Sequence, residues 1–293
     1  MMRSEKEMMD LILNTASNHE RIRAVIMNGS RTNPNAKKDL FQDYDIVYIV
    51  KNIESFTLDH SWVDIFGERI MMQMPESKVL PPAENDGRFI YLMQFIDGNR
   101  IDLTLIPLEK MDELIKYDSL SMLLLDKDGI IEPLPPSSDE DYHIKRPSEK
   151  EFADICNEFW WICMNISKGL WREELTYAMF MYEQVNRNVL IQMIEWYIGI
   201  KTNFTKSAGK CGKYIEDFLD KDEWNEFVAT YSDANYENIW QALFNMCNLF
   251  RKVAIIVANH FEFEYPYDDD KNVTKYLKNV KYLPGDAQKF ISL

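Results

Sequence analysis

The chain has 293 residues, of which 46% are hydrophobic, so it can bury a substantial core and global disorder is excluded. Its formal net charge of −15 argues against a nucleic-acid partner, because polynucleotides attract basic surfaces. The same charge suits a small polycationic partner, which a negative cleft would concentrate. A plain acidic cytosolic protein would explain the charge equally well.

Cysteine usage and hydropathy indicate a cytoplasmic location. The cysteines show neither a CxxC pair nor zinc-ligand spacing, and we interpret them as buried free thiols in a reducing compartment: Cys156, Cys163, Cys211 and Cys247. The N-terminus lacks the apolar core of a signal peptide, and no run approaches the roughly 18 apolar residues of a membrane span. We therefore expect no membrane partner, and a monomer or weak homo-oligomer.

In the first half of the chain, helical and strand patterns are mixed. Ser4 and Glu7 form a capping-box pattern, and the apolar spacing behind them predicts a helix over 4–20. The turn signal Asp97-Gly98-Asn99 predicts a tight hairpin. Strands are expected at 22–27, 45–50, 68–74, 88–96 and 100–106, and helical segments within 31–42, 62–67 and 108–117.

A proline-rich, acidic segment at 133–141 is the best linker in the chain. We therefore predict one domain over residues 1–135 and a second over 136–293.

The second half of the chain has a helical pattern. Ser148 and Glu151 form another capping box. Apolar stripes at i, i+3 and i+4 spacing predict helices over 152–163, 175–197 and 239–257. The tail after Asp268 gives no prediction. The expected fold class is α+β, with a small mixed β-sheet flanked by helices, followed by an α-helical bundle.

The stretch from Asn28 to Val50 carries the residues with chemical potential. A Gly29-Ser30 turn follows the first strand, and Asp43-Tyr44-Asp45 leads into the second. Since side chains alternate along a strand, Asp43 and Asp45 point to the same side, as ligands of Mg²⁺ would. The glycine lets the backbone approach a phosphate. Together these features indicate phosphoryl or nucleotidyl transfer, with a solvated strand edge as the plainer alternative.

Asp102 is an acid within the otherwise apolar strand 100–106. A charge in such a place is costly unless it lies at a site or is paired. Asp102 is therefore a candidate site residue, while a salt bridge or edge exposure is the alternative.

Gly29-Ser30, twelve residues and then Asp43-Tyr44-Asp45-Ile46 resemble the signature of the DNA-polymerase-β-like nucleotidyltransferase superfamily. Within it, segments 28–31, 39–45 and 209–214 resemble the aminoglycoside 6-adenylyltransferases, also called streptomycin adenylyltransferases, and the similarity runs nearly end to end. The resemblance implies a nucleotidyltransferase domain followed by a helical substrate-binding domain. It also implies transfer of AMP from ATP to streptomycin, at the 6-hydroxyl, which confers antibiotic resistance.

The resemblance assigns roles to particular residues. Asp43 and Asp45 would be catalytic Mg²⁺ ligands, and Asp102 a third ligand or the general base. The nucleotide would bind Gly29, Ser30, Arg31, Lys210 and Lys213, with Lys206 in the same basic loop. The cationic aminoglycoside would meet Glu173, Glu174 and Glu183.

Plainer alternatives exist for the basic and acidic residues outside the Asp-Tyr-Asp motif. Arg31 would equally suit an ion pair with Asp39 or Asp43. Lys210 and Lys213 would suit an exposed helix start, and charged helix residues such as Glu183 are usually solvated.

Other functions remain open at this point. The same fold would serve another acceptor, such as a lincosamide, a different aminoglycoside or a protein hydroxyl. A non-catalytic nucleotide-binding module is an alternative of a different class. Nucleic-acid polymerisation fits poorly with the negative charge.

Overall fold

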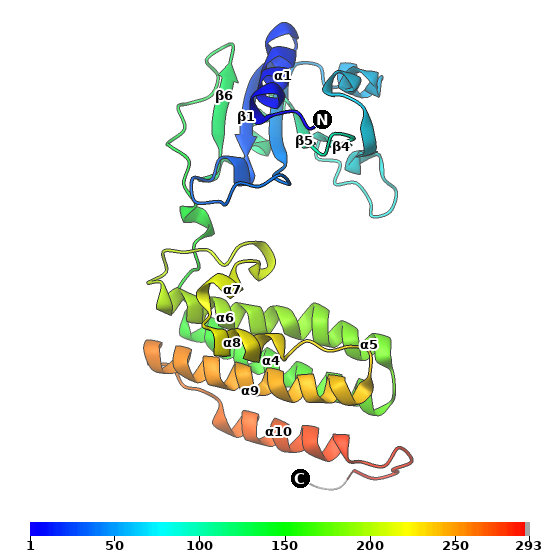
Figure 1. The fold of residues 1–293 in the computed structure, drawn as a ribbon, viewed down its shortest axis with the longest axis vertical. Coiled ribbons are helices and arrows are strands. Elements are labelled where there is room, and N and C mark those ends of the chain that lie inside the picture. The colour runs from blue at the N-terminus through cyan, green and yellow to red at the C-terminus, as the bar shows by residue number, and fades with distance from the viewer. Residues whose placement is uncertain (291–293) are drawn as a thin grey trace. The chain divides into compact units, whose positions relative to one another are not determined.

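The computed structural model describes residues 1–290 and divides into two compact units, Met1–Asp141 and Tyr142–Leu293. The division lies at the end of the proline-rich segment 133–141. The first unit combines a β-sheet with short helices, and the second is helical (Figure 1). The α+β class predicted from the sequence is confirmed.

The strands of the first unit form one mixed sheet. They run in the spatial order β3-β4-β5-β2-β1-β6, with β2 and β5 parallel and the remaining neighbours antiparallel. Their bounds are β1 (Ile22–Asn28), β2 (Tyr44–Val50), β3 (Arg69–Gln73), β4 (Phe89–Phe95), β5 (Arg100–Pro107) and β6 (Met122–Asp126).

Each face of the sheet has its own core. Helix α1 (Glu5–Asn18) buries Met8 and Ile12 in the core on one face, together with Tyr48 of β2. Ile49 and Ile106 belong to a smaller core on the opposite face, which the segment around α3 (Met111–Leu114) helps to cover. Because strand residues alternate, Asp45 and Asp102 share this second, less covered face.

Short helical segments connect the strands of the first unit. These are α2 (Glu54–Thr57), α3, and 3₁₀ turns at Gly29–Arg31, His60–Phe66, Pro75–Ser77, Leu108–Lys110 and Glu140–Tyr142. The helix expected within 31–42 is wrong: that described segment continues from the Gly29–Arg31 turn as an irregular loop. The segment is polar and contains Pro34, so it lacks the apolar face that would stabilise a helix.

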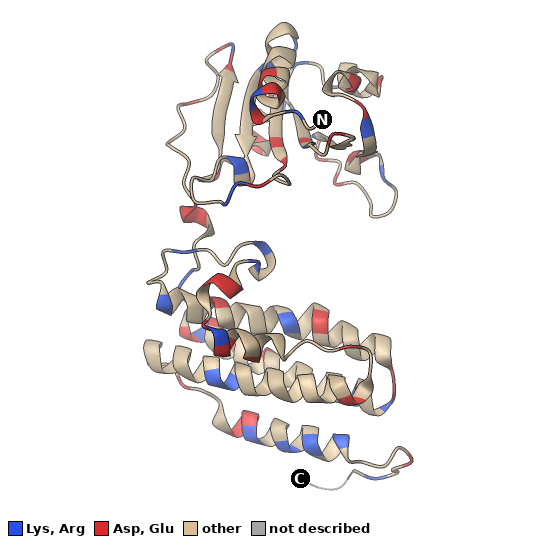
Figure 2. Ribbon diagram, in the orientation of Figure 1, with Lys and Arg blue, Asp and Glu red and all other residues tan. Residues whose placement is uncertain are grey.

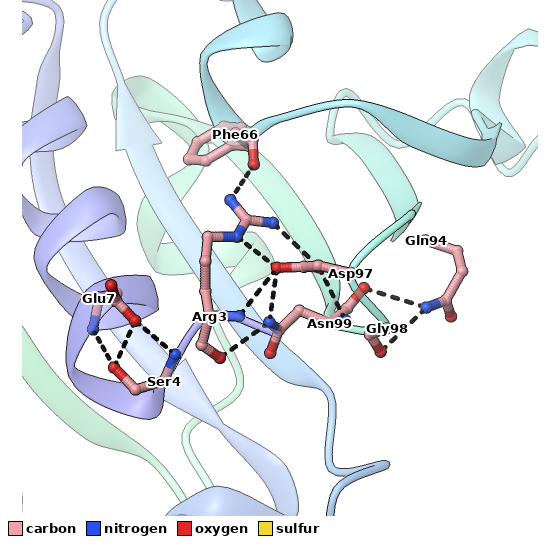
Figure 3. Close-up of polar contacts among 8 residues, drawn as sticks. All are labelled: Arg3, Ser4, Glu7, Phe66, Gln94, Asp97, Gly98 and Asn99. Carbon is pink, nitrogen blue, oxygen red and sulfur yellow. Dashed lines mark hydrogen bonds and ion pairs between the residues drawn. The ribbon is translucent and has the colours of Figure 1, made fainter. Parts of the chain in front are cut away.

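The N-terminus fastens the β4–β5 hairpin, as Figure 3 shows. The Arg3 guanidinium donates to Asp97 over 2.6 Å and to the Phe66 carbonyl over 2.5 Å. The Asn99 amide donates to the Arg3 carbonyl over 3.1 Å. Arg3 holds the pKa of Asp97 well below its usual range. These contacts fix the turn that immediately precedes β5, the strand that carries Asp102.

The second unit is built from helices that pack around one large apolar core. They are α4 (Glu149–Trp171), α5 (Leu175–Met179), a π-helical segment (Phe180–Asn186), α6 (Arg187–Lys201), α7 (Ile215–Phe218), α8 (Lys221–Val228), α9 (Tyr236–Phe261) and α10 (Tyr267–Lys281). Phe159 of α4 stacks on Phe250 of α9 with ring centres 3.7 Å apart.

Helix α10 lies in the C-terminal tail, where no element was predicted. Figure 2 shows acidic residues in its first turn and basic residues toward its end, which complements the helix dipole. Leu277 anchors α10 in the core of the second unit. Among residues 1–290, no helix combines the length and apolarity that a bilayer span requires.

Candidate active site

Asp45 and Asp102 are direct neighbours on adjacent parallel strands. Asp45 of β2 is in register with Asp102 of β5 on one side and with Asn28 of β1 on the other. Asp43 lies one residue before the start of β2, in the loop that leads into the strand. The structure brings these three acids together at one end of the sheet.

Gly29 allows the Asp45 carboxylate to approach the turn after β1. Its φ of +77° is a conformation that side chains other than glycine disfavour. A Cβ placed on Gly29 would lie 2.2 Å from Asp45 Oδ2. The glycine is therefore required both by the backbone conformation and by the carboxylate that occupies the space beside it.

The acids crowd one another and are partly withdrawn from water. Burial raises the pKa of Asp45 to about 6, and the negative charges of Asp102 and Asp43 add to the shift. Burial likewise raises the pKa of Asp43. Carboxylates held together in this way favour a cation between them.

Arg100 supplies positive charge to this cluster, a contact the sequence analysis missed. Its Nε and Nη2 donate to the two oxygens of Asp102 over 2.7 and 2.8 Å, and its Nε lies 3.6 Å from Asp43 Oδ2. The hydrogen bond to Asp102 raises the pKa of Arg100. The signal was available, since residues i and i+2 of a strand share a face.

The donor set fits a hard divalent cation, because all three groups offer carboxylate oxygens. As the side chains lie, however, no three His, Cys, Asp or Glu residues among residues 1–290 are arranged to hold a metal ion. Arg100 engages both oxygens of Asp102 in this arrangement. A cation shared by Asp43, Asp45 and Asp102 would therefore require the guanidinium to move aside.

Arg31 shapes the loop that leads to Asp43. Its guanidinium donates to the carbonyls of Asp43 and Gln42 over 3.0 and 2.7 Å and stacks on Tyr44 at 3.6 Å from the ring centre. Arg31 also lies 3.9 Å from a Glu5 carboxylate oxygen, and its hydrogen bonds go to backbone carbonyls, so the alternative of an ion pair with Asp39 or Asp43 is not what the structure shows. Its assignment to the nucleotide stays a prediction.

Ser30 lies in the 3₁₀ turn that follows β1, half-buried and next to Gly29. The Gln42 amide donates to the Ser30 carbonyl over 3.3 Å, and the Thr32 hydroxyl donates to the Gly29 carbonyl over 2.8 Å and to the Leu120 carbonyl. The turn is thus tied to the loops on both sides of it.

The predicted lysines belong to the second unit. Lys210 opens a short turn after Gly209, whose φ is +74°, and Lys213 follows the turn with its Nζ 4.9 Å from the Tyr214 ring centre. Lys206, Lys210 and Lys213 have exposed side chains. Their assignment to the triphosphate stays a prediction.

The predicted acceptor-binding acids have different surroundings. Glu183 lies in the π-helical segment, and both of its oxygens accept from Arg187 over 3.0 Å. Glu174 is exposed and 3.8 Å from Arg172, while the exposed Glu173 adopts a φ of +58°. Glu183 is thus engaged in a helix contact, and the assignment of all three to the acceptor stays a prediction.

The structure also points to polar groups that the sequence analysis passed over. Asn28 Oδ1 is buried and has no hydrogen-bond partner among the described residues. Glu195 on α6 is half-buried, and this burial raises its pKa. Asn28 directly precedes the Gly-Ser turn, so its place beside Asp45 was predictable from the hairpin-like return of β2.

Known proteins similar to this chain match it over nearly its whole length, a span that includes the Gly-Ser and Asp-Tyr-Asp motifs. A family described as "Streptomycin adenylyltransferase" matches residues 2–280. Aminoglycoside 6-adenylyltransferases from Bacillus subtilis (strain 168) and Campylobacter jejuni are each 44% identical over 280 residues, covering 95% and 96% of this chain and 98% and 96% of those proteins. A crystal structure of an aminoglycoside 6-adenyltransferase from Bacillus subtilis is 39% identical, covers 96% of this chain and 100% of that chain, and gives a TM-score of 0.48. By the extent of these sequence matches, the chain belongs to the streptomycin adenylyltransferase family.

Proposed function

We propose that this protein transfers AMP from ATP to a hydroxyl of an aminoglycoside, and that the acceptor is the 6-hydroxyl of streptomycin. Such a transfer would inactivate the drug and confer resistance. The observation that carries the proposal is the in-register pair of Asp45 and Asp102, held against a side-chain-free turn at Gly29. The relatives at 44% identity, named aminoglycoside 6-adenylyltransferases, support the choice of acceptor class.

In the proposed reaction, the acceptor hydroxyl attacks the α-phosphorus, a new O–P bond forms and pyrophosphate leaves with the electrons of the bond that breaks. Asp43, Asp45 and Asp102 would hold Mg²⁺, which supplies Lewis-acid stabilisation of the phosphate charge. Asp102 would alternatively act as the general base that receives the hydroxyl proton, instead of as a third ligand. Arg100, once released from Asp102, would be free to donate to phosphate oxygens.

The backbone at Gly29 and Ser30 would face the leaving phosphates, because the turn presents N–H groups without a side chain in the way. The acidic composition of the chain, at a net charge of −15, favours a cationic acceptor over a polynucleotide.

Asp45→Asn tests the proposal directly. We expect the rate of AMP transfer to streptomycin to fall on the order of a thousandfold, because a charge that stabilises the transition state is lost. Mass spectrometry of the product and pyrophosphate release measure that rate. Asp10→Asn, an exposed acid on α1, is the matched control and should retain activity. Full activity in Asp45→Asn would refute the assignment.

Although Asp45→Asn should lose activity, we expect the same substitution to stabilise the metal-free protein. The Asp45 pKa is raised from 3.8 to about 6, so the folded state keeps the proton more tightly and loses stability as pH rises between those values. Two pKa units correspond to at most about 3 kcal/mol. Metal-free Asp45→Asn should therefore gain unfolding free energy over the parent above pH 6 and show no gain below pH 4, as urea titrations would show. A gain that is independent of pH would contradict this explanation.

A further inference from the structure

A cavity of about 450 Å³ lies on the sheet face that carries Asp45 and Asp102. Its floor includes Val47 of β2 and Thr104 of β5, each the next residue on that face after one of the acids. Small-molecule sites typically measure about 300–1,000 Å³, so the cavity can accept part of a substrate. The proposed reaction assigns no substrate group to this cavity.

The cavity extends along the strands, away from the acids. Ile106, four residues beyond Asp102 on β5, also lines it, and that interval spans roughly 13 Å at the rise of a strand. Ile115 and Tyr117 contribute apolar and aromatic surface from the segment after α3. This length suits a sugar and a fused bicyclic base laid end to end from the acids.

The end of the cavity nearest the acids offers an unused acceptor. Asn28 lines the cavity and is in register with Asp45, and its buried Oδ1 has no partner among residues 1–290. A buried acceptor left without a donor destabilises the protein, so its place here favours a ligand that donates a hydrogen bond. A hydroxyl of the ribose that carries the α-phosphate would supply this hydrogen bond.

The charge of the lining does not favour a polycation. The charged lining residues are Asp86, Arg88, Glu113 and Lys116, so acids and bases are equal in number. Arg88 Nε already donates to Asp86 over 2.5 Å. An aminoglycoside would gain little from such a surface, whereas a neutral nucleoside would gain apolar contact and a few hydrogen bonds.

We propose that this cavity binds the nucleoside of the donor nucleotide. A ribose hydroxyl donates to Asn28 Oδ1, and the base lies over Val47 and Thr104. The turn at Gly29 and Ser30 is then left for the phosphates, and the acceptor enters from outside the cavity. The inference rests on the proposed function and adds to it the part of the site that selects the donor.

Val47→Phe, which fills the floor of the cavity, tests the inference by calorimetry. The probes are α,β-methylene-ATP with Mg²⁺, inorganic tripolyphosphate with Mg²⁺, and streptomycin. We expect the ATP analogue to bind at least about tenfold more weakly, while tripolyphosphate and streptomycin bind as in the parent. Val228→Phe, at an exposed position on α8, is the control and should change none of the three.

Other outcomes overturn the inference in distinguishable ways. If streptomycin weakens and the ATP analogue does not, the cavity binds the acceptor. If Val47→Phe changes neither, the cavity binds no substrate. If the parent protein fails to bind the ATP analogue at all, the proposed function fails together with the inference. Thr104→Leu, at a partly exposed position, repeats the test should Val47→Phe fail to fold.

The role of Asn28 is tested separately with deoxynucleotides. One of the two analogues, 2′-deoxy-ATP or 3′-deoxy-ATP, lacks the ribose hydroxyl that donates to Asn28. The parent should bind ATP more tightly than that analogue. Asn28→Ala should abolish that difference, because the acceptor is gone, while leaving tripolyphosphate binding unchanged. An undiminished preference for the ribose hydroxyl in Asn28→Ala would contradict the assigned contact.

Discussion

Gly29 lies where a positive φ and an approaching carboxylate leave no room for a side chain. The two effects differ in kind, since the backbone conformation affects the stability of the turn and the contact with Asp45 affects the geometry of the acids. Gly129 separates them, because its φ is +66° and a Cβ there would meet nothing within 4 Å.

Gly29→Ala and Gly129→Ala should therefore diverge. Each should lose about 1–2 kcal/mol of unfolding free energy from the backbone conformation alone. Gly29→Ala should also lose AMP-transfer activity by at least about a hundredfold, because the Asp45 carboxylate must move. Urea titration and turnover, measured on both variants, check this. Equal activity in the two variants would show that the contact with Asp45 is unimportant.

The positions of individual acids were partly accessible from the sequence. Alternation along a strand predicted that Asp43 and Asp45 share a side, whereas the place of Asp102 beside them was implied by the family resemblance. The expected strand began at Asp45, one residue after the observed start of β2 at Tyr44, and Asp43 precedes both. The contacts of Arg100 and Arg31 depend on where long side chains find carboxylates and carbonyls, and a pattern of residue types does not determine that.

Among the elements, the π-helical segment Phe180–Asn186 is linked to the start of α6 by an ion pair between Glu183 and Arg187. Glu183 within it is bound through both oxygens to Arg187, whose side chain is nearly fully buried. Arg187 also donates to the hydroxyl and carbonyl of Thr230, in the turn after α8. π-Helical segments are frequent at functional sites, so a structural and an acceptor-binding role for Glu183 both merit measurement.

Glu183→Gln should mainly destabilise the second unit. Removing one partner of a buried ion pair leaves an uncompensated charge on Arg187, and we expect a loss of about 3 kcal/mol. Thermal unfolding measures that loss, and the Michaelis constant for streptomycin tests the predicted acceptor role separately. Glu174→Gln, at an exposed position, is the control for stability. A large rise in the Michaelis constant with unchanged stability would instead assign Glu183 to the acceptor.

Elements with local signals were predictable. Ser4 and Ser148 begin α1 and α4 with both hydrogen bonds of a capping box, as the spacing to Glu7 and Glu151 indicated. The helix expected within 31–42 failed, because its polar residues gain nothing from helical packing. Helix α10 was missed because most of its residues are polar. Its buried residues pack mainly against α4, which is far away in the sequence.

At the scale of the whole molecule, the apolar cores are separate. The clusters containing Ile46 and Ile49 lie within residues 1–141, and the cluster containing Leu243 lies within the second unit. Each unit therefore has the buried surface needed to unfold as its own cooperative transition.

Two matched core substitutions test this independence. Ile46→Ala and Leu243→Ala each remove buried side-chain volume and should cost about 2–5 kcal/mol. Differential scanning calorimetry should show that Ile46→Ala lowers the transition of the first unit and Leu243→Ala that of the second. Adding Mg²⁺ and an ATP analogue should raise the first transition more than the second if the donor binds mainly to the first unit. A single transition that both substitutions shift equally would contradict this independence.

Under the proposed function, the guanidinium of Arg100 and a divalent ion would compete for the carboxylate oxygens of Asp102. Loading would then exchange a single positive charge at those oxygens for a double one, so part of the charge that the ion brings would already be balanced before it binds. Each loading event would also free an arginine side chain for the substrate phosphates.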